Sequence, residues 1–218
     1  GTSVAECFVA YDTSYPKSGH HEQNPLDWWQ ALVSATRILL QQGSVEVKDI
    51  VCLAVSGHSL GVVPIGRNGE LLSHNIPIWS DSRAGKQAEE FFQHVSAEEW
   101  YLTTGNGFPA PLYSIFKLMW FKENLPHVYE KTAKFIGTKD YINYRLTGIL
   151  CTDPSYASGS GVYDLKAWGY RPAYIENSGI AADKLAEIRP STDILGTILP
   201  EVAQELGLSE HTQVACGG

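Results

Sequence analysis

Residues Val55–Leu71 read VSGHSLGVVPIGRNGEL and contain GHSLG, a match to the G-x-S-x-G motif of serine hydrolases. In those enzymes the motif lies between a strand and a helix whose N-terminus faces the oxyanion. After Gly61, however, the chain continues with two valines, a proline and a glycine, which oppose a helix. The dipeptide Asn68-Gly69 is typical of a tight hairpin turn, because both residues tolerate positive φ. The sequence therefore predicts a strand and a hairpin after Ser59.

A serine hydrolase is nevertheless an alternative that the motif leaves open. Asp193 and His211 follow Ser59 in the chain order that α/β-hydrolases use. With 7 histidines and 24 acidic residues in the chain, that order arises readily by chance. No HGGG-like oxyanion segment precedes the motif. We therefore expect that Ser59 is not a covalent nucleophile.

Composition and charge bound the class of protein. The chain has 218 residues, 44% of them hydrophobic, which suffices for one large domain or two small ones. A net charge of -8 and the lack of a dense basic patch argue against nucleic acid as a partner. No apolar run is long enough to span a membrane, and no N-terminal segment resembles a signal peptide. These features predict a globular, cytoplasmic protein that does not bind membranes.

The cysteines are scattered along the chain. Cys7, Cys52, Cys151 and Cys216 form no C-x-x-C pair, and no histidines cluster near them. The sequence therefore predicts neither a disulfide framework nor a zinc site. A reducing compartment fits this pattern best.

Strand signals are found near both ends of the chain. Predicted strands are Val4–Tyr15, Asp49–Ser56, Val62–Ile65 with a further extended piece ending at Trp79, Asp193–Ile198 and Gln213–Cys216. Asp49–Ser56 is nearly all apolar, so we expect it to be buried on both faces.

Helix signals fill the middle of the chain. Asn24 and Pro25 open a helix, because asparagine accepts a hydrogen bond from a free helical N–H and proline suits the first helical position. Ser96 and Glu99 form a capping-box pair at the start of another helix. Helical texture runs from Ser82 to Leu146, a polar loop covers Thr152–Gly161, and a helix follows Pro200. The whole pattern predicts an α/β domain with a helix-rich insertion.

Several motifs along the chain occur in a fixed order. They are E-x-N-P-x-x-W-W (Glu22 to Trp29), VSGHSLG, IWSDSR (Ile78 to Arg83), TGN (Thr104 to Asn106), KDYINYRLTG (Lys139 to Gly148), TDPSYASG (Thr152 to Gly159) and the closing VACGG. From about Tyr15 to Gly218, this series resembles the FGGY family of carbohydrate kinases, and its xylulokinase-like branch most. The resemblance implies the actin-like, ribonuclease-H-like N-terminal domain of a two-domain kinase. Such a kinase transfers the γ-phosphoryl group of ATP, with Mg²⁺, to a hydroxyl of a pentulose, a related sugar or a polyol.

The resemblance implies a sugar site built from His58, Ser59, Trp79, Asp81 and Arg83. A sugar pocket needs an aromatic platform beside directed hydrogen-bond partners, and Trp79 and Asp81 supply both. Because they lie two residues apart on an extended segment, we expect them to point to the same side. The alternative is that Trp79 is a core residue and Asp81 caps the following helix. Arg83 would then be a salt-bridge or capping partner that organises the segment.

One part of the site departs from the family pattern. Relatives carry longer polar side chains where this chain has His58-Ser59-Leu60, and leucine cannot form a hydrogen bond through its side chain. His58 either binds a substrate hydroxyl or is a structural histidine. This departure leaves open a second function for the chain, as a non-catalytic sugar-binding or regulatory module of the same fold. We expect the Thr152–Ser155 segment to order its loop rather than touch substrate.

The ends of the chain lack parts that the resemblance implies. The family's metal-coordinating acid lies in an N-terminal D-x-G-T-[ST] loop, and its catalytic base is an Asp that follows the closing glycines. Gly1-Thr2-Ser3 is either a remnant of that loop or, as we favour, part of the next strand, and the base is expected just after Gly218. We therefore expect residues 1–218 to be a sugar-binding N-terminal domain truncated at both ends, without the ATP-binding domain and inactive alone. The sequence leaves the oligomeric state open, with a homodimer as one alternative.

Overall fold

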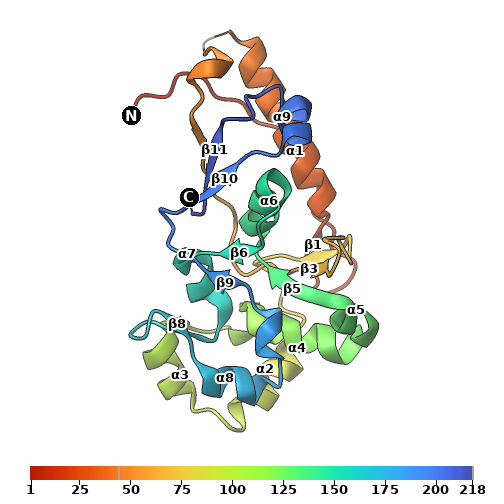
Figure 1. Cartoon of the computed structure of the whole chain (residues 1–218). Helices are drawn as coiled ribbons and strands as arrows, with labels where there is room; N and C mark the ends of the chain where they lie inside the picture. The colour runs from red at the N-terminus through yellow and green to blue at the C-terminus, as the bar shows by residue number, and fades with distance from the viewer. Residues whose placement is uncertain (44, 218) are drawn as a thin grey trace.

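In the computed structural model, which describes residues 1–43 and 45–217, helices alternate with short strands along an elongated molecule (Figure 1). The α-helices are α1 (Pro25–Gln41), α2 (Gly85–Phe92), α3 (Ala97–Thr104), α4 (Ser114–Asn124), α5 (Pro126–Lys131), α6 (Thr138–Thr147), α7 (Pro154–Ala157), α8 (Pro172–Ser178) and α9 (Pro200–Leu206). The strands are β1 (Glu22–Gln23), β2 (Cys52–Leu53), β3 (Val63–Gly66), β4 (Ile76–Pro77), β5 (Thr132–Ile136), β6 (Cys151–Thr152), β7 (Tyr163–Asp164), β8 (Gly169–Tyr170), β9 (Glu187–Ile188), β10 (Ile194–Thr197) and β11 (Gln213–Ala215).

The strands pair into several small sheets. In the three-stranded sheet, β11 lies between antiparallel β10 and parallel β2. Strand β3 pairs with β5 in antiparallel register, with Val63 opposite Ile136. The remaining pairs are β1 with β4, β6 with β9, and β7 with β8. The β3–β5 pair lies near the middle of the molecule in Figure 1, between the two groups of helices.

Two hydrophobic cores meet at β3 and β5. The first packs α1, α6 and α9 together with β4 and β11 and includes Trp29 and Leu146, while the second belongs to α2, α3, α4, α5 and α8 and includes Trp100. Next to each other at the start of β3, Val62 belongs to the second core and Val63 to the first. This follows from the period-2 alternation of an extended chain. The segment before β3 therefore lies where the two cores join.

Several local signals in the sequence form the expected elements. Helix α1 begins at Pro25, and the Asn24 side-chain oxygen accepts from the Leu26 N–H at 3.1 Å. Helix α3 begins after Ser96, whose hydroxyl accepts from the Glu99 N–H at 3.4 Å. The expected helix after Pro200 is α9, and the last two expected strands are β10 and β11.

The expected hairpin follows Gly61, but its turn differs in detail. Gly66 N–H donates to the Glu70 carbonyl, and Gly69 N–H donates to the Gly66 carbonyl. Gly69 has a φ of +83°, whereas Asn68 is not in the left-handed region. The turn therefore uses the conformational freedom of Gly69 alone.

Two expected strands are wrong or much shorter than predicted. Residues 4–13 form no strand, because they find no neighbouring strand among the described residues, and only Ser14 bridges to Glu22. The Asp49–Ser56 segment forms only the two-residue β2, and Val51 is 72% exposed. Within the described chain β2 pairs with β11 alone, and its residues are exposed (Cys52) or half-buried (Leu53), so the segment is not buried on both faces.

The middle of the chain also differs from its prediction. The expected polar loop over Thr152–Gly161 contains the end of β6, helix α7 and a 3₁₀ turn over Ser158–Ser160. Asp153 caps α7 by accepting from the Ser155 N–H at 3.3 Å. Strand β5 lies within Ser82–Leu146, the stretch of predicted helical texture, and it is stabilised by pairing with the distant β3.

Candidate functional site

The GHSLG segment forms a strained turn where the two cores join. Gly61 N–H donates to the Ser59 carbonyl at 2.9 Å, which closes a three-residue turn centred on Leu60. Leu60 has a φ of +66°, and among the described residues the only other non-glycine with positive φ is Trp168. A residue with a side chain pays about 1–3 kcal/mol for such a conformation, so the surroundings must hold it in place.

Side chains from three different helices hold the other carbonyl oxygens of this turn. The donors are Thr138 of α6 to His58, Lys117 of α4 to Leu60 at 2.9 Å, and Tyr156 of α7 to Gly61. With the Ser59 carbonyl already bonded, every carbonyl from residue 58 to 61 accepts a hydrogen bond. The turn is therefore fixed by the fold and does not depend on a ligand for its shape.

The second glycine of the motif is explained by packing. A Cβ at Gly61 would lie 2.6 Å from Cγ2 of Thr138, closer than two carbon atoms can approach. Glycine at this position lets the turn pack directly against the start of α6. The match to G-x-S-x-G thus has a steric cause that requires no catalytic serine.

The turn lacks the parts of a nucleophile elbow. Strand β3 follows it, as predicted, and not a helix. Ser59 is exposed, and within the part of the chain that the structure describes no hydrogen bond joins its hydroxyl to a histidine. His211, the candidate base, is exposed, and its backbone N–H donates to the Ser209 hydroxyl at 3.2 Å. The geometry therefore gives no support to the hydrolase interpretation.

Ser59 lines a small polar cleft. The cleft has a volume of about 170 Å³ and is lined by Ser56, Gly57, Ser59, Lys139, Ser155 and Tyr156. The Lys139 ammonium donates to Asp140 at 2.6 Å and to the Cys216 carbonyl at 3.1 Å, and it pairs with Asp153 at 2.9 Å. Its three protons are therefore all used. Ser155 donates its hydroxyl to Asp153, so the free hydroxyls among the described residues of the cleft are those of Ser56 and Ser59.

Asp153 orders the segment at the rim of this cleft, as expected from the sequence. Its Oδ2 accepts from the hydroxyls of Ser155 and Ser191, both at 2.6 Å. Burial by itself raises the pKa of Asp153, but the hydrogen bonds from Ser155, Ser191 and Lys139 outweigh burial and lower it to about 2. Asp153 is completely buried, so its carboxylate has a structural role.

Trp79 and Asp81 do not point to the same side. The chain turns at Trp79 and Ser80, and Asp81 N–H donates to the Ile78 carbonyl at 3.0 Å. This turn breaks the expected alternation, so Trp79 is 52% exposed while Asp81 is 0% exposed. The alternative interpretation of these two residues is also wrong in both of its parts. Trp79 is not a core residue, and Asp81 does not cap the following helix, because α2 begins only at Gly85 without a side-chain cap.

Asp81 and Arg83 form a buried ion pair beneath the Trp79 turn. Arg83 donates to Asp81 through Nε at 2.9 Å and Nη2 at 2.7 Å, and its Nη2 also pairs with Glu22 at 2.7 Å. Asp81 Oδ2 also accepts from the His21 N–H at 2.7 Å. Burial raises the pKa of Asp81, but the hydrogen bonds from Arg83 and His21 more than offset this and lower it. The pair organises the segment, which agrees with the salt-bridge interpretation of Arg83.

His58 faces α1 and the strand before it. Its Nε2 lies 3.2 Å from the Gln23 side-chain oxygen, which also accepts from the Trp28 indole at 3.0 Å. Burial lowers the pKa of His58, so the neutral ring donates from Nε2 and keeps a lone pair on Nδ1. Within the described chain that Nδ1 has no partner. His58 lines a groove of about 400 Å³ that also borders Ser56, Gly57 and Lys139 of the polar cleft.

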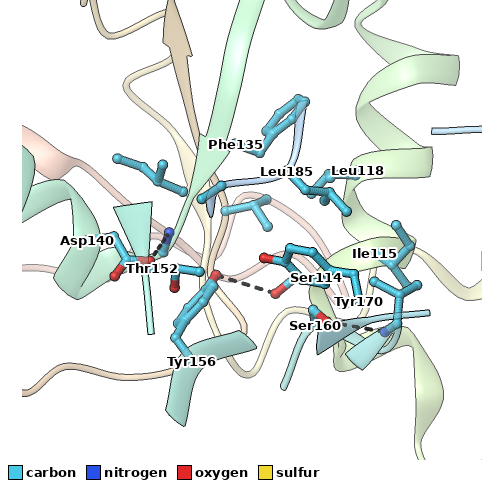
Figure 2. Close-up of a pocket in the computed structure, with 15 residues that line it drawn as sticks. Ser114, Ile115, Leu118, Phe135, Asp140, Thr152, Tyr156, Ser160, Tyr170 and Leu185 are labelled. Carbon is cyan, nitrogen blue, oxygen red and sulfur yellow. Dashed lines mark hydrogen bonds between the residues drawn. The ribbon is translucent and has the colours of Figure 1, made fainter. Parts of the chain in front are cut away.

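A closed cavity next to the turn is too small for a sugar. It lies between α4, β5 and α7, with Ser114, Phe135 and Tyr156 among the residues that point into it (Figure 2). Its volume of about 30 Å³ has room for one or two water molecules. Tyr156, whose hydroxyl bonds the Gly61 carbonyl, separates this cavity from the polar cleft, since it lines both.

The described residues contain neither a metal-binding cluster nor a membrane-spanning helix. No group of three His, Cys, Asp or Glu side chains in residues 1–43 and 45–217 is arranged to hold a metal ion. No helix among them is long and apolar enough to cross a membrane. The closing motif VACGG runs to Gly218, which lies outside the described residues.

The sequence did not single out Lys117, the residue that holds the Leu60 carbonyl. It is 0% exposed, and it also donates to the Ile78 carbonyl at 2.7 Å. The available signal was its position within the apolar run SIFKLMWF of α4, where a lysine is unusual.

Comparison with known proteins completes the picture of the site. The family model for the FGGY family of carbohydrate kinases, N-terminal domain, matches residues 1–218. The chain is 32% identical over 221 residues to a xylulose kinase of Bacillus subtilis, a match that covers 100% of this chain and 43% of that protein. This chain thus spans less than half the length of this curated relative.

Solved structures give the same result at the level of the fold. The gluconate kinase of Lactobacillus acidophilus superposes with a TM-score of 0.87 at 27% identity, covering 96% of this chain and 42% of that one. The xylulose kinase of Rhodospirillum rubrum superposes with a TM-score of 0.86 at 26% identity, covering 95% and 42%. The expected actin-like, ribonuclease-H-like N-terminal domain fold is therefore confirmed.

Proposed function

Because the chain belongs to the FGGY family of carbohydrate kinases, we propose that it is the acceptor-binding part of an ATP-dependent kinase for a pentulose, a related sugar or a polyol. The proposal rests on the family match over residues 1–218. It is supported by the turn that carries Ser59, which hydrogen bonds fix in place, and by the exposed Trp79. The names of relatives, xylulose kinase and gluconokinase, support a small polyhydroxylated acceptor. We propose that the whole chain is one domain of a longer protein.

Trp79 and the turn at Ser59 are the proposed contacts with the sugar. An exposed indole ring can stack on the apolar C–H face of a sugar, and hydroxyl and imidazole groups can bond its hydroxyls. The exposed Ser59 hydroxyl is available for such a bond, whereas Nδ1 of His58 is unpartnered but buried, so the side chain of His58 would have to turn to reach a sugar. Asp81 and Arg83 are proposed to act from beneath, by holding the turn that carries Trp79.

In the proposed reaction this domain mainly positions the acceptor hydroxyl and contributes little to bond making and breaking. Phosphoryl transfer depends chiefly on holding the acceptor oxygen in line with the γ-phosphorus. The hydroxyl loses its proton as the new O–P bond forms, and the family resemblance assigns that proton to an Asp expected just after Gly218. Mg²⁺ would stabilise the charge on the phosphates, but the described acids form no cluster that fits it. As the family resemblance implies, the residues that hold Mg²⁺ and ATP are proposed to lie outside the described chain.

The test is ATP consumption by the full-length protein. A panel of pentuloses, hexuloses, gluconate and polyols would be supplied with ATP and Mg²⁺, and ADP release would be followed by a coupled assay. We expect one class of acceptor to stimulate ADP release strongly over the rate without acceptor. If no acceptor in the panel does so while ATP binding is intact, the proposed function is wrong. A homodimer and a cytoplasmic location stay predictions.

A further inference from the structure

Lys117 is a buried cation held by backbone carbonyls. Its side chain on α4 is 0% exposed, and its ammonium donates to the Leu60 carbonyl at 2.9 Å and the Ile78 carbonyl at 2.7 Å. Among the described residues it forms no salt bridge with a carboxylate. Burial lowers the pKa of Lys117 to about 7, an effect that nearby Asp81 opposes and Arg83 reinforces. Burying a charge without a paired anion is costly, so such a residue is uncommon in a core.

The two carbonyls belong to the two segments that carry the proposed sugar contacts. Leu60 directly follows Ser59 and is the residue in the strained left-handed conformation. Ile78 directly precedes Trp79, and its carbonyl also accepts the Asp81 N–H that closes the Trp79 turn. One ammonium group thus joins two turns from different parts of the chain. No other side chain in the described residues donates to both.

The bond to Leu60 also bears on the strain of the turn. Releasing the Leu60 carbonyl would leave a partly buried acceptor without its lysine donor and remove one of the contacts that hold a positive φ. The turn could then relax toward an ordinary conformation and move Ser59 relative to Trp79. Because a displacement of about 1 Å at a reacting centre can lower a rate substantially, the spacing of the two turns matters to the reaction.

We propose that Lys117 is a positioning residue for the acceptor sugar, which fixes the Ser59 turn and the Trp79 turn at the spacing that the sugar requires. This inference rests on the proposed function. Lys117 is too deeply buried to touch the sugar, so it acts through the backbone of Leu60 and Ile78.

The test compares two substitutions on α4 in the full-length protein. Lys117→Met keeps much of the side chain's length and removes its donors, and Leu118→Ala creates a cavity at a buried residue (2% exposed) that donates to neither turn. With Lys117→Met we expect KM for the sugar to rise about tenfold or more, while KM for ATP changes by less than about twofold. With Leu118→Ala we expect Tm to fall and KM for the sugar to remain unchanged.

Each outcome separates the inference from the proposed function. If wild-type protein phosphorylates no acceptor, the proposed function fails. If wild type is active and Lys117→Met leaves KM for the sugar unchanged, the positioning role is wrong. The same holds if Leu118→Ala raises that KM equally. If Lys117→Met does not fold, Lys117→Arg carries the test, because it keeps donors but changes their geometry. An unchanged KM for the sugar in a folded Lys117→Arg variant would also overturn the inference.

Discussion

The buried ion pair beneath the Trp79 turn can be tested by replacing Asp81 with asparagine. Asp81→Asn keeps the shape of the side chain but removes its charge and turns one acceptor into a donor that faces Arg83. The Arg83 side chain is only 4% exposed, and it would retain Glu22 as its sole carboxylate partner. Breaking a buried pair typically costs about 3–5 kcal/mol, and the remaining Glu22 places the expected loss near the lower end, about 3 kcal/mol.

The assay is urea unfolding of wild type and variant at neutral pH, with Glu90→Gln as the control. Glu90 pairs with Lys86 at 3.5 Å on the surface, where both side chains are largely exposed. Removing that exposed pair should leave the stability nearly unchanged. A loss of less than about 1 kcal/mol for Asp81→Asn would show that the Asp81–Arg83 pair does not hold the turn.

The same pair predicts a pH dependence with a definite sign. The folded-state pKa of Asp81 is lowered below its ordinary value of 3.8. A lowered carboxylate pKa stabilises the fold at pH values above the unfolded-state pKa, and this stability is lost as pH falls through the folded-state pKa. The difference in stability between wild type and Asp81→Asn should therefore be constant near neutral pH and shrink below about pH 4. A difference that grows on acidification would contradict the assignment.

Further predictions concern the turn, its indole neighbour and the polar cleft. Trp79→Ala in the full-length protein should lower kcat/KM for the sugar by about tenfold or more and leave KM for ATP nearly unchanged, as steady-state kinetics would show. A fluorophosphonate probe should leave Ser59 unlabelled, whereas stoichiometric labelling that Ser59→Ala abolishes would restore the hydrolase interpretation. Gly61→Ala should destabilise the fold by about 1–3 kcal/mol in denaturant unfolding, because its Cβ would meet Thr138. Asp153, with a pKa of about 2, should stabilise wild type fully above about pH 4 and lose that contribution toward pH 2, and Asp153→Asn should remove this part of the acid transition in thermal melts.

Local signals in the sequence were enough to predict much of the fold. The valines and proline after Gly61 predicted β3, and Asn24 and Ser96 marked helix starts that the structure has. These predictions succeeded because each depends on interactions within a few residues. The order of motifs along the chain added the fold family, since it samples many distant positions at once.

Features that depend on distant partners could not be predicted from the sequence. Strand β5 lies among helical segments and is stabilised by pairing with β3. The local sequence pattern therefore did not predict a strand there. Residues 4–13 have strand-like composition but find no partner in the described chain. β-Propensity decides little without a neighbouring strand.

The site shows the same limit at single residues. Period-2 alternation predicted that Trp79 and Asp81 point to one side. The chain turns at Trp79–Ser80 instead, and the Arg83 that binds Asp81 also pairs with Glu22, a residue distant in sequence. Lysine is usually a surface residue, and only the tertiary structure shows that the buried Lys117 ammonium donates to two backbone carbonyls.

The most direct test of the account is a crystal structure of the full-length protein with its preferred acceptor and a non-hydrolysable ATP analogue. The account predicts that the sugar lies against the indole of Trp79, within hydrogen-bond distance of the turn at Ser59, with Lys117 still bonded to the Leu60 and Ile78 carbonyls. A sugar bound elsewhere on the domain, with Trp79 and Ser59 free of contact, would contradict it.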